Sequence, residues 1–430
     1  MSDLLAARAQ MALSLGFHIV FAEIGIAMPL LMVLAEWRWR RTGDEVYYQL
    51  AKRWAKGTAV LFAVGAVSGT VLSFELGLLW PAFMRVAGPI IGIPFSLEGF
   101  AFFTEAIFLG VYLYGWERIS ARAHLLAGLI VAASGAASAM FVVMVNAWMN
   151  TPVGIVMSAG HITQIDPIAG MLNPSTAQQV LHMLLAAYAA TGLAVAGVHA
   201  AVLLRRPQAA FHRRALTLAL TIGAPAALLQ PLSGDISART VAESQPVKLA
   251  ALEGQFETEN GAPLRIGGVP DVNAGVTRYA IEIPHGLSLL AFRDPRAEVK
   301  GLYAFRRDLW PPVAPVHLAF QVMVAAGSAM ALVAAWAAFV AFRRRGVEQN
   351  RWLLRALAIV APFGFIATEA GWTVTEVGRQ PWVISGILRT SDAVTPMPGL
   401  AVPMTLFAFL YLGLGVIVAV VIGSLVRETA

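Results

Sequence analysis

Two histidines and one methionine lie inside long apolar segments, where their side chains can bind iron. His18 and Met323 stand about two helical turns into their segments, and His182 stands near the start of its own. Neutral imidazole is a standard axial ligand of haem iron, and a His/Met pair gives a low-spin haem that transfers electrons. A histidine so placed can equally be a hydrogen-bonded packing residue, and a lone methionine is more often packing than ligand.

Four glutamates form two pairs whose members are seven residues apart, Glu98 with Glu105 and Glu369 with Glu376. At this spacing both members share one helix face, about 10 Å apart in depth. Ionisable groups in the hydrocarbon are costly and are usually functional. Glu98 and Glu105 therefore predict a proton relay toward a buried reaction centre; the alternative is a helix–helix hydrogen bond.

The segment from Gly371 to Trp382 joins two tryptophans, an acid, an arginine, glycines and a proline at the edge of an apolar run. Trp372 and Trp382 alone would indicate an interfacial belt. Arg379 beside Glu376 is compatible with a simple ion pair. An arginine can also bind a haem propionate through two hydrogen bonds.

The elements that must position these residues are membrane helices. Of the 430 residues, 58% are hydrophobic and 13% are charged, well below the charged fraction of a soluble domain. Nine apolar runs are long enough to cross the hydrocarbon core. They cover residues 11–35, 57–78, 96–115, 125–148, 179–204, 215–232, 316–342, 352–372 and 400–426. We therefore expect an all-α polytopic membrane protein with nine transmembrane helices.

Basic residues orient these helices. Of the 31 Lys and Arg, 18 fall in the connections and C-terminal end that share one side, and four fall in the short segments of the other side. Positive residues accumulate on the cytoplasmic side, so the N-terminus is expected outside and the C-terminus in the cytoplasm. This topology explains the net charge of +6 without a nucleic-acid partner. The absence of cysteine excludes iron–sulfur clusters and covalently attached c-type haem.

Three regions follow from this pattern. Residues 1–232 hold helices 1 to 6 and residues 316–430 hold helices 7 to 9. Residues 233–315 carry eight prolines and nineteen charged residues, and are expected to form a hydrophilic outer loop. A loop of this length is usually functional.

The chain resembles subunit I of cytochrome bd-type quinol oxidases. The stretch Gly371–Trp382 matches the long signature G-W-x-x-x-E-x-G-R-Q-P-W. Further matches run along nearly the whole chain, at 17–18, 97–105, 115–118, 146–152, 248–253 and 319–324. The resemblance implies a multi-pass protein of the bacterial inner membrane that oxidises quinol and reduces O2 to water.

The resemblance also implies roles for individual residues. His182 and Met323 would hold a low-spin haem b, and Glu376 a high-spin haem b. His18 would hold the oxygen-reducing haem, with Glu98 beside it as second ligand or proton donor. Glu105 would lie on the proton path, and Arg379 with Trp372 near the haems. Lys248 and Glu253 would serve quinol oxidation in the outer loop, although the residues alone suggest a solvated helix edge.

Some features depart from the family or stay open. The family often has arginine where Gln321 stands, so a charge near the low-spin haem is absent here. The outer loop lacks the long insertion of one branch, so the chain resembles the short-loop branch, which includes cyanide-insensitive oxidases. The oxygen site can hold haem d or a further haem b. A second membrane subunit, and a small single-helix one, are implied as partners.

Two other classes of protein compete with the oxidase. A secondary transporter would use the intramembrane carboxylates to bind ions, and would show broken helices and repeated halves near the midplane. A haem-binding assembly subunit would bind haem without turnover. Haem content separates the first from the oxidase, and quinol-dependent oxygen consumption separates the second.

Overall fold

The structure is a computed structural model, and it describes residues 1–158, 161–343 and 346–427. In these residues nine spans are long and apolar enough to cross a membrane, which confirms the predicted all-α fold. In chain order they are α1 (Asp3–Thr42), α2 (Glu45–Leu79), α3 (Pro81–Tyr114), α4 (Ala121–Asn150), α6 (Thr176–Arg205), α7 (Ala210–Ser244), α10 (Val313–Phe342), α11 (Arg351–Val360) with α12 (Phe363–Val377), and α14 (Ala401–Arg427).

Several helices extend beyond their apolar runs. Ser2 caps α1 by accepting from the Leu5 amide, and Gly43, with a φ of 69°, ends it. The extension matters most in α3, which begins at Pro81 and continues through two internal prolines. Glu98 therefore lies near the middle of a 34-residue helix, and not at its outer end as the apolar run suggested.

The eighth span is broken, whereas the sequence predicts one continuous helix over 352–372. α11 ends at Val360 and α12 begins at Phe363. Pro362 lies between them, and proline lacks the backbone N–H that helix continuation needs. α12 then runs to Val377, into the signature segment.

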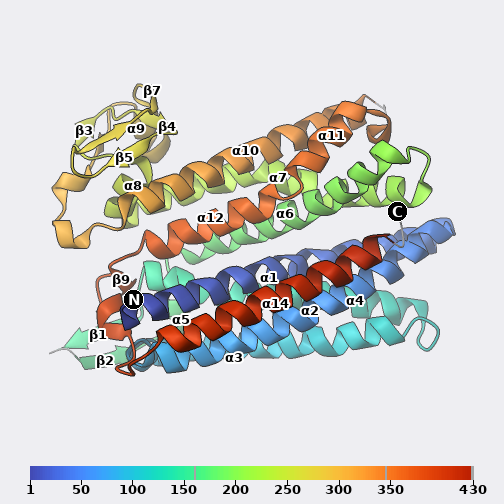
Figure 1. Ribbon diagram of the computed structural model, residues 1–430, viewed down its shortest axis with the longest axis horizontal. Coiled ribbons are helices and arrows are strands. Elements are labelled where there is room, and N and C mark those ends of the chain that lie inside the picture. Colours follow the sequence, from blue (N-terminus) through green and yellow to red (C-terminus); the bar gives the residue numbers. More distant parts are fainter. Residues whose placement is uncertain (159–160, 344–345, 428–430) are drawn as a thin grey trace.

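The spans form two groups that lie side by side (Figure 1). One group holds α1 to α4 with α14, and the other holds α6, α7 and α10 to α12. α6 joins the groups because it contacts α1 and α4 as well as α7. α6 and α7 approach closely, since a Cβ at Gly192 would lie 2.5 Å from Gly223 Cα. Small residues allow such backbone approach between membrane helices.

The outer excursion begins later than the sequence suggests. α7 continues past residue 232 to Ser244, where Ala242 packs in a small apolar cluster with Leu249. This packing stabilises the polar last turns of the helix. After α7 come α8 (Pro246–Glu253) and α9 (Gly286–Phe292), the short 3-10 turns 302–304 and 307–309, and three antiparallel strand pairs. The pairs are β3 (Glu259–Asn260) with β8 (Glu298–Val299), β4 (Leu264–Ile266) with β7 (Ile281–Ile283), and β5 (Val269–Asp271) with β6 (Val276–Arg278).

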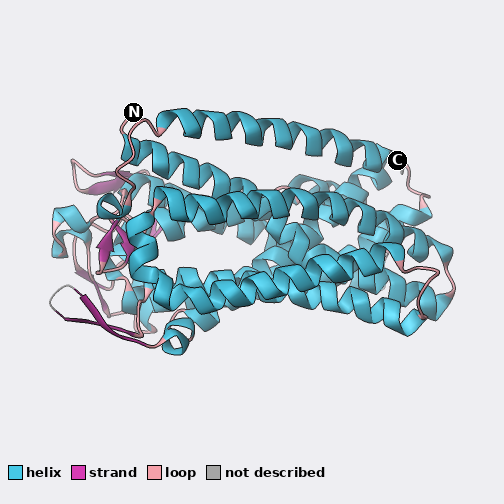
Figure 2. Cartoon of the chain, turned by 90° about the horizontal axis from the view of Figure 1, so that it is seen from below, coloured by secondary structure: helices cyan, strands magenta, loops and turns pink. Residues whose placement is uncertain are grey.

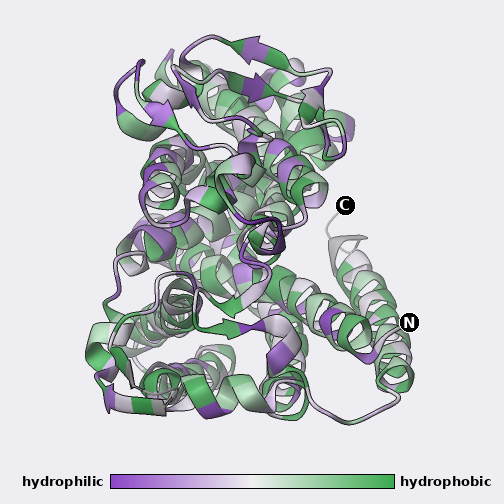
Figure 3. Cartoon of the chain, turned by 90° about the vertical axis from the view of Figure 1, so that its left-hand side faces the viewer, coloured by the Kyte–Doolittle hydropathy of each residue, from purple (hydrophilic) through white to green (hydrophobic). Residues whose placement is uncertain are grey.

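All these strands gather at one end of the helix bundle (Figure 2). The same end carries the short helices α5 (Pro167–Met171) and α13 (Thr390–Ala393), and the pairs β1 (Ile155–Ser158) with β2 (His161–Ile165) and β9 (Trp382–Ile384) with β10 (Leu388–Arg389). The N-terminus lies at this end and the C-terminus lies toward the opposite one. Seen from the strand end, hydrophilic residues recur along these loops and strands (Figure 3). We refer to this end as the outer end, following the charge pattern.

Candidate functional site

The ring of His18 on α1 is oriented by a serine of α2. His18 Nδ1 lies 2.9 Å from Ser68 Oγ. The Ser68 hydroxyl lies 3.0 and 3.1 Å from Val64 O and Gly65 O, so when it donates to one of these carbonyls it accepts from His18 Nδ1. The lone pair is then on Nε2, the atom that can bind a metal. A Cβ at Gly69 would lie 3.0 Å from His18 Cε1, so glycine leaves room for the ring.

His182 on α6 repeats this arrangement with a serine of α7. Its Nδ1 lies 2.9 Å from Ser233 Oγ, and Ser233 donates to Gln230 O at 2.9 Å. When Ser233 donates to this carbonyl, Nδ1 is again the protonated nitrogen. The side-chain amide nitrogen of Gln230 lies 3.1 Å from Nε2 and 3.4 Å from Nδ1. A haem iron at His182 would therefore take the place of the Gln230 amide.

Other histidines with described partners lack this pattern. Both ring nitrogens of His124 and of His317 face carboxylate or carbonyl oxygens. His199 Nδ1 lies 2.8 Å from His212 Nδ1. Metal-ligating histidines usually have one nitrogen fixed by a hydrogen bond and the other available. His18 and His182 fit axial ligation on this criterion; His285 also has one carbonyl contact, but it is exposed in the outer excursion and lies outside the membrane spans.

Met323 lies in the outer half of α10, with its sulfur against α12. A Cβ at Gly371 would be 3.1 Å from Met323 Sδ, and the partly buried Trp372 follows Gly371. α6 and α10 both contact α7 and α12. His182 and Met323 thus belong to helices that share the same two neighbours.

The signature segment joins Glu376 and Arg379 at the outer end of α12. Arg379 donates to Glu376 Oε2 at 2.5 Å, and Asn146 of α4 donates to Oε1. Arg379 is only 4% exposed, and its Nε and second terminal nitrogen have no partner in the described structure. Buried unpaired donors are costly. These two donors fit an anionic group such as a haem propionate, beside a carboxylate that can bind iron.

The predicted acid pair on α3 faces α4. Ser138 donates to Glu98 Oε1 at 3.2 Å, and a Cβ at Gly135 would lie 3.2 Å from Glu105 Oε1. Glu105 is 6% exposed. The spacing of seven residues therefore does place both carboxyl groups against one neighbouring helix.

Lys248 and Glu253 of α8 are buried, 4% and 3% exposed, so they do not form a solvated helix edge. Lys248 Nζ donates to Asn150 Oδ1 at 2.8 Å. Burial and the nearby positive charge of Arg379 lower the pKa of Lys248 to about 7. Burial raises the pKa of Glu253 to about 7, against the opposing effect of Arg265. Both groups can exchange a proton near neutral pH.

Hydrogen bonds connect Lys248 to Glu376. Asn150 links Lys248 to Asn146, since Asn150 Nδ2 lies 3.1 Å from Asn146 Oδ1, and Asn146 donates to Glu376. Both asparagines lie in the matched stretch 146–152, but sequence reasoning assigned them no role, although their spacing of four residues puts them on one helix face. Sequence reasoning also missed Ser68 and Ser233, whose pairing with histidines arises only from helix packing.

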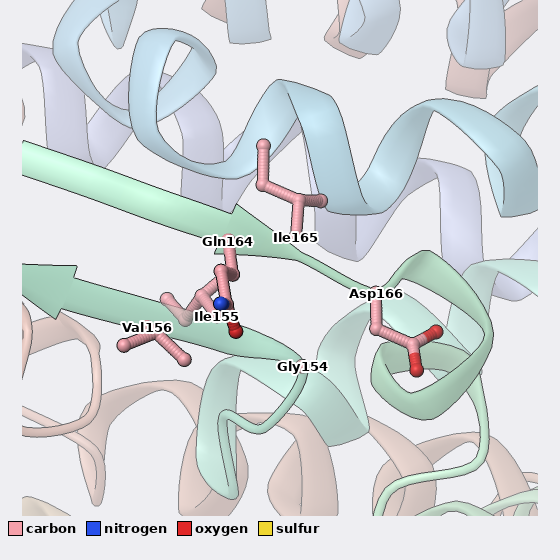
Figure 4. A pocket seen from close by; sticks show the side chains of 6 residues that line it. All are labelled: Gly154, Ile155, Val156, Gln164, Ile165 and Asp166. Carbon is pink, nitrogen blue, oxygen red and sulfur yellow. The ribbon is translucent and has the colours of Figure 1, made fainter.

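Two further features lie apart from these ligands. Glu23, to which the sequence assigned no role, is 5% exposed with Oε2 unpartnered. A hollow at the base of the β1–β2 hairpin is lined by Gly154, Ile155, Val156, Gln164, Ile165 and Asp166 (Figure 4). None of the candidate ligands lines it.

Comparison with known proteins identifies the family of the chain. The family model for cytochrome bd terminal oxidase subunit I matches residues 6–430. A putative cytochrome bd menaquinol oxidase subunit I from Bacillus subtilis is 41% identical over 98% of this chain and 96% of its own length. A cytochrome bd ubiquinol oxidase subunit 1 from the same organism is 32% identical over 92% of this chain and 87% of its own length.

The solved structure of bd oxidase from Geobacillus thermodenitrificans superposes with a TM-score of 0.94 and 39% identity, over 100% of this chain and 99% of that one. The relatives are covered nearly end to end, so the likeness extends to the whole subunit. Proteins of this family are haem-containing respiratory enzymes that act with a second subunit on quinol and O2. The chain belongs to the cytochrome bd oxidase subunit I family, and it is a quinol oxidase subunit of a bacterial membrane.

Proposed function

We propose that this subunit holds three haems near its outer end and couples quinol oxidation there to reduction of O2 to water. The observation that carries the proposal is the shared geometry of His18 and His182. In each, Nδ1 lies 2.9 Å from a serine hydroxyl that also contacts a backbone carbonyl oxygen, and this favours the tautomer with Nε2 as the ligand atom. Haem iron, when bound, would supply one-electron transfer and the centre at which oxygen is reduced.

Each ligand has an assignment. His182 and Met323 hold the low-spin haem b, and Glu376 holds the high-spin haem b. His18 holds the oxygen-reducing haem, which is haem d or a further haem b. Arg379 binds a propionate through its two unpaired donors, and Trp372 lies beside these ligands on α12.

Lys248 and Glu253 act on quinol. Oxidation removes two electrons and two protons from quinol. Glu253 accepts one hydroxyl proton as its carboxylate, the second proton is released to water, and the electrons pass one at a time to the haem that His182 and Met323 would hold. Lys248 binds a quinol oxygen as a hydrogen-bond donor. Both side chains are buried at the outer end, so the protons leave to the outer side.

Protons for water formation come from the cytoplasm by way of Glu105 and then Glu98. Both side chains face α4, and Glu105 is the nearer of the two to the cytoplasmic end of α3. Quinol oxidation outside and proton uptake from inside separate charge without a pump. The second membrane subunit completes the enzyme, and we include a small single-helix subunit in the proposed complex.

Substitution of His182 or Met323 by leucine tests the low-spin assignment. Each change removes one axial ligand, so the low-spin haem b band should be lost from the reduced-minus-oxidised spectrum while the other haem bands remain. A full low-spin band in both variants would overturn the assignment.

A further inference from the structure

Two side chains at the outer end of α10 tie this helix to the outer excursion. His317 is 0% exposed, with Nδ1 at 2.7 Å from Leu252 O and Nε2 at 3.0 Å from Gly267 O. Gln321 accepts from the Gly267 amide at 2.8 Å and donates to Arg265 O at 3.1 Å. We call His317 and Gln321 the α10 clamp.

Both ring nitrogens of His317 face backbone carbonyl oxygens, so whichever nitrogen carries the proton ties α10 to the outer excursion. A carbonyl oxygen only accepts hydrogen bonds, and a neutral imidazole has one N–H. Leu252 O lies in the last turn of α8, where carbonyls lack helical partners, so the His317 ring supplies a partner for it.

The α10 clamp holds the backbone next to Glu253 and at Arg265, two residues at the proposed quinol site. Leu252 directly precedes Glu253. Arg265, whose backbone Gln321 holds, is the cation that acts on the pKa of Glu253. Gln321 also lies two residues from Met323 on the same helix.

We propose that the α10 clamp holds the quinol-binding part of the outer excursion at a fixed position relative to Met323. His317 and Gln321 are therefore positioning residues for quinol oxidation. This inference rests on the proposed role of Lys248 and Glu253. The clamp also explains why glutamine, and not arginine, stands at position 321. Glutamine can accept from the Gly267 amide and donate to Arg265 O, whereas an arginine side chain cannot accept.

The test uses the purified complete oxidase with Gln321→Leu, Gln321→Arg and His317→Asn. The matched control is His285→Asn, because His285 is an exposed loop histidine with one carbonyl contact, and asparagine tolerates its φ of 63°. The readouts are hydrogen–deuterium exchange of peptides covering 262–270, kcat and KM for a water-soluble quinol, and the reduced-minus-oxidised spectrum.

Loss of one or two hydrogen bonds should speed exchange in 262–270 by about threefold to tenfold or more. The KM for quinol should rise by a similar factor, with the haem bands retained, and the His285 variant should match the native enzyme. Unchanged exchange in the Gln321 variants would overturn the clamp. Faster exchange with an unchanged KM would overturn its positioning role. If the native enzyme did not oxidise quinol, the proposed function would fail, while the exchange data would still report on the clamp. If His317→Asn does not fold, the Gln321 variants decide.

Discussion

At the residue scale, function follows from buried groups whose partners are only partly supplied by the protein. Arg379 has two unpaired donors, and Glu253 has Oε2 unpaired. Such groups are costly to bury unless a ligand or a transferred proton completes them. The sequence singled out both residues, but their burial and missing partners became visible only in the fold.

Glu253→Gln should remove the rise of quinol oxidation with pH. Burial raises the pKa of Glu253 to about 7, and only its carboxylate can accept a proton. The native rate should therefore rise as pH increases through about 7. The variant should lose this rise and fall in kcat by about 100-fold or more. Steady-state oxygen consumption across pH measures both, and a rising limb retained in the variant would show that another group accepts the proton.

Arg379→Lys should lower the haem content although it keeps the positive charge. Lysine lacks the planar fork that binds a carboxylate through two hydrogen bonds. The haem-to-protein ratio and the high-spin haem band should both decrease. Arg389→Lys, at a half-exposed arginine paired with Asp308, is the control and should retain both. Equal haem content in the two variants would argue against a propionate at Arg379.

At the element scale, helix contacts decide which residues become ligands. The spacing of Glu98 and Glu105 predicted correctly that they share a face, because helical periodicity is a local property. The depth of Glu98 in α3 was not predictable, because the helix continues through Pro89 and Pro94. The break at Pro362 was missed because the apolar run is continuous across it. The serine partners of His18 and His182 depend on packing between helices, for which the sequence has no local signal.

Gly371→Ala should perturb the low-spin haem. The added methyl would lie 3.1 Å from Met323 Sδ, a contact that requires the sulfur to shift by a few tenths of an ångström. The low-spin band should shift or weaken. Gly57→Ala is the control, because a Cβ there meets nothing within 4 Å. An unchanged band in Gly371→Ala would place Met323 away from the haem.

At the scale of the whole molecule, charge and hydropathy predicted the nine spans and the excursion at one end, because the bilayer imposes both patterns on the sequence. The internal structure of the excursion was not predictable, since its strands have only two or three residues each. Such short pairs depend on contacts with α9 and α10, which pack against β4, β5 and β8.

The orientation predicts which side a protease can reach. Trypsin added to right-side-out vesicles should cut the excursion at exposed residues such as Arg278 and Arg296. In inverted vesicles it should cut the basic cytoplasmic connection around 205–214. Mass spectrometry of the released peptides identifies the sites. The reverse pattern would invert the topology and move quinol oxidation to the cytoplasmic side.

The most direct test of haem-based quinol oxidation is the dithionite-reduced minus air-oxidised visible spectrum of the purified enzyme, with haem counted per subunit. We expect haem b bands and about three haems per subunit I, the number that the ligand sets of His18, His182 with Met323, and Glu376 provide. A red-shifted chlorin band would assign haem d to the His18 site, and its absence would assign a further haem b. A preparation assembled with cofactor supply that shows no haem signal would contradict the proposed ligands and the mechanism built on them.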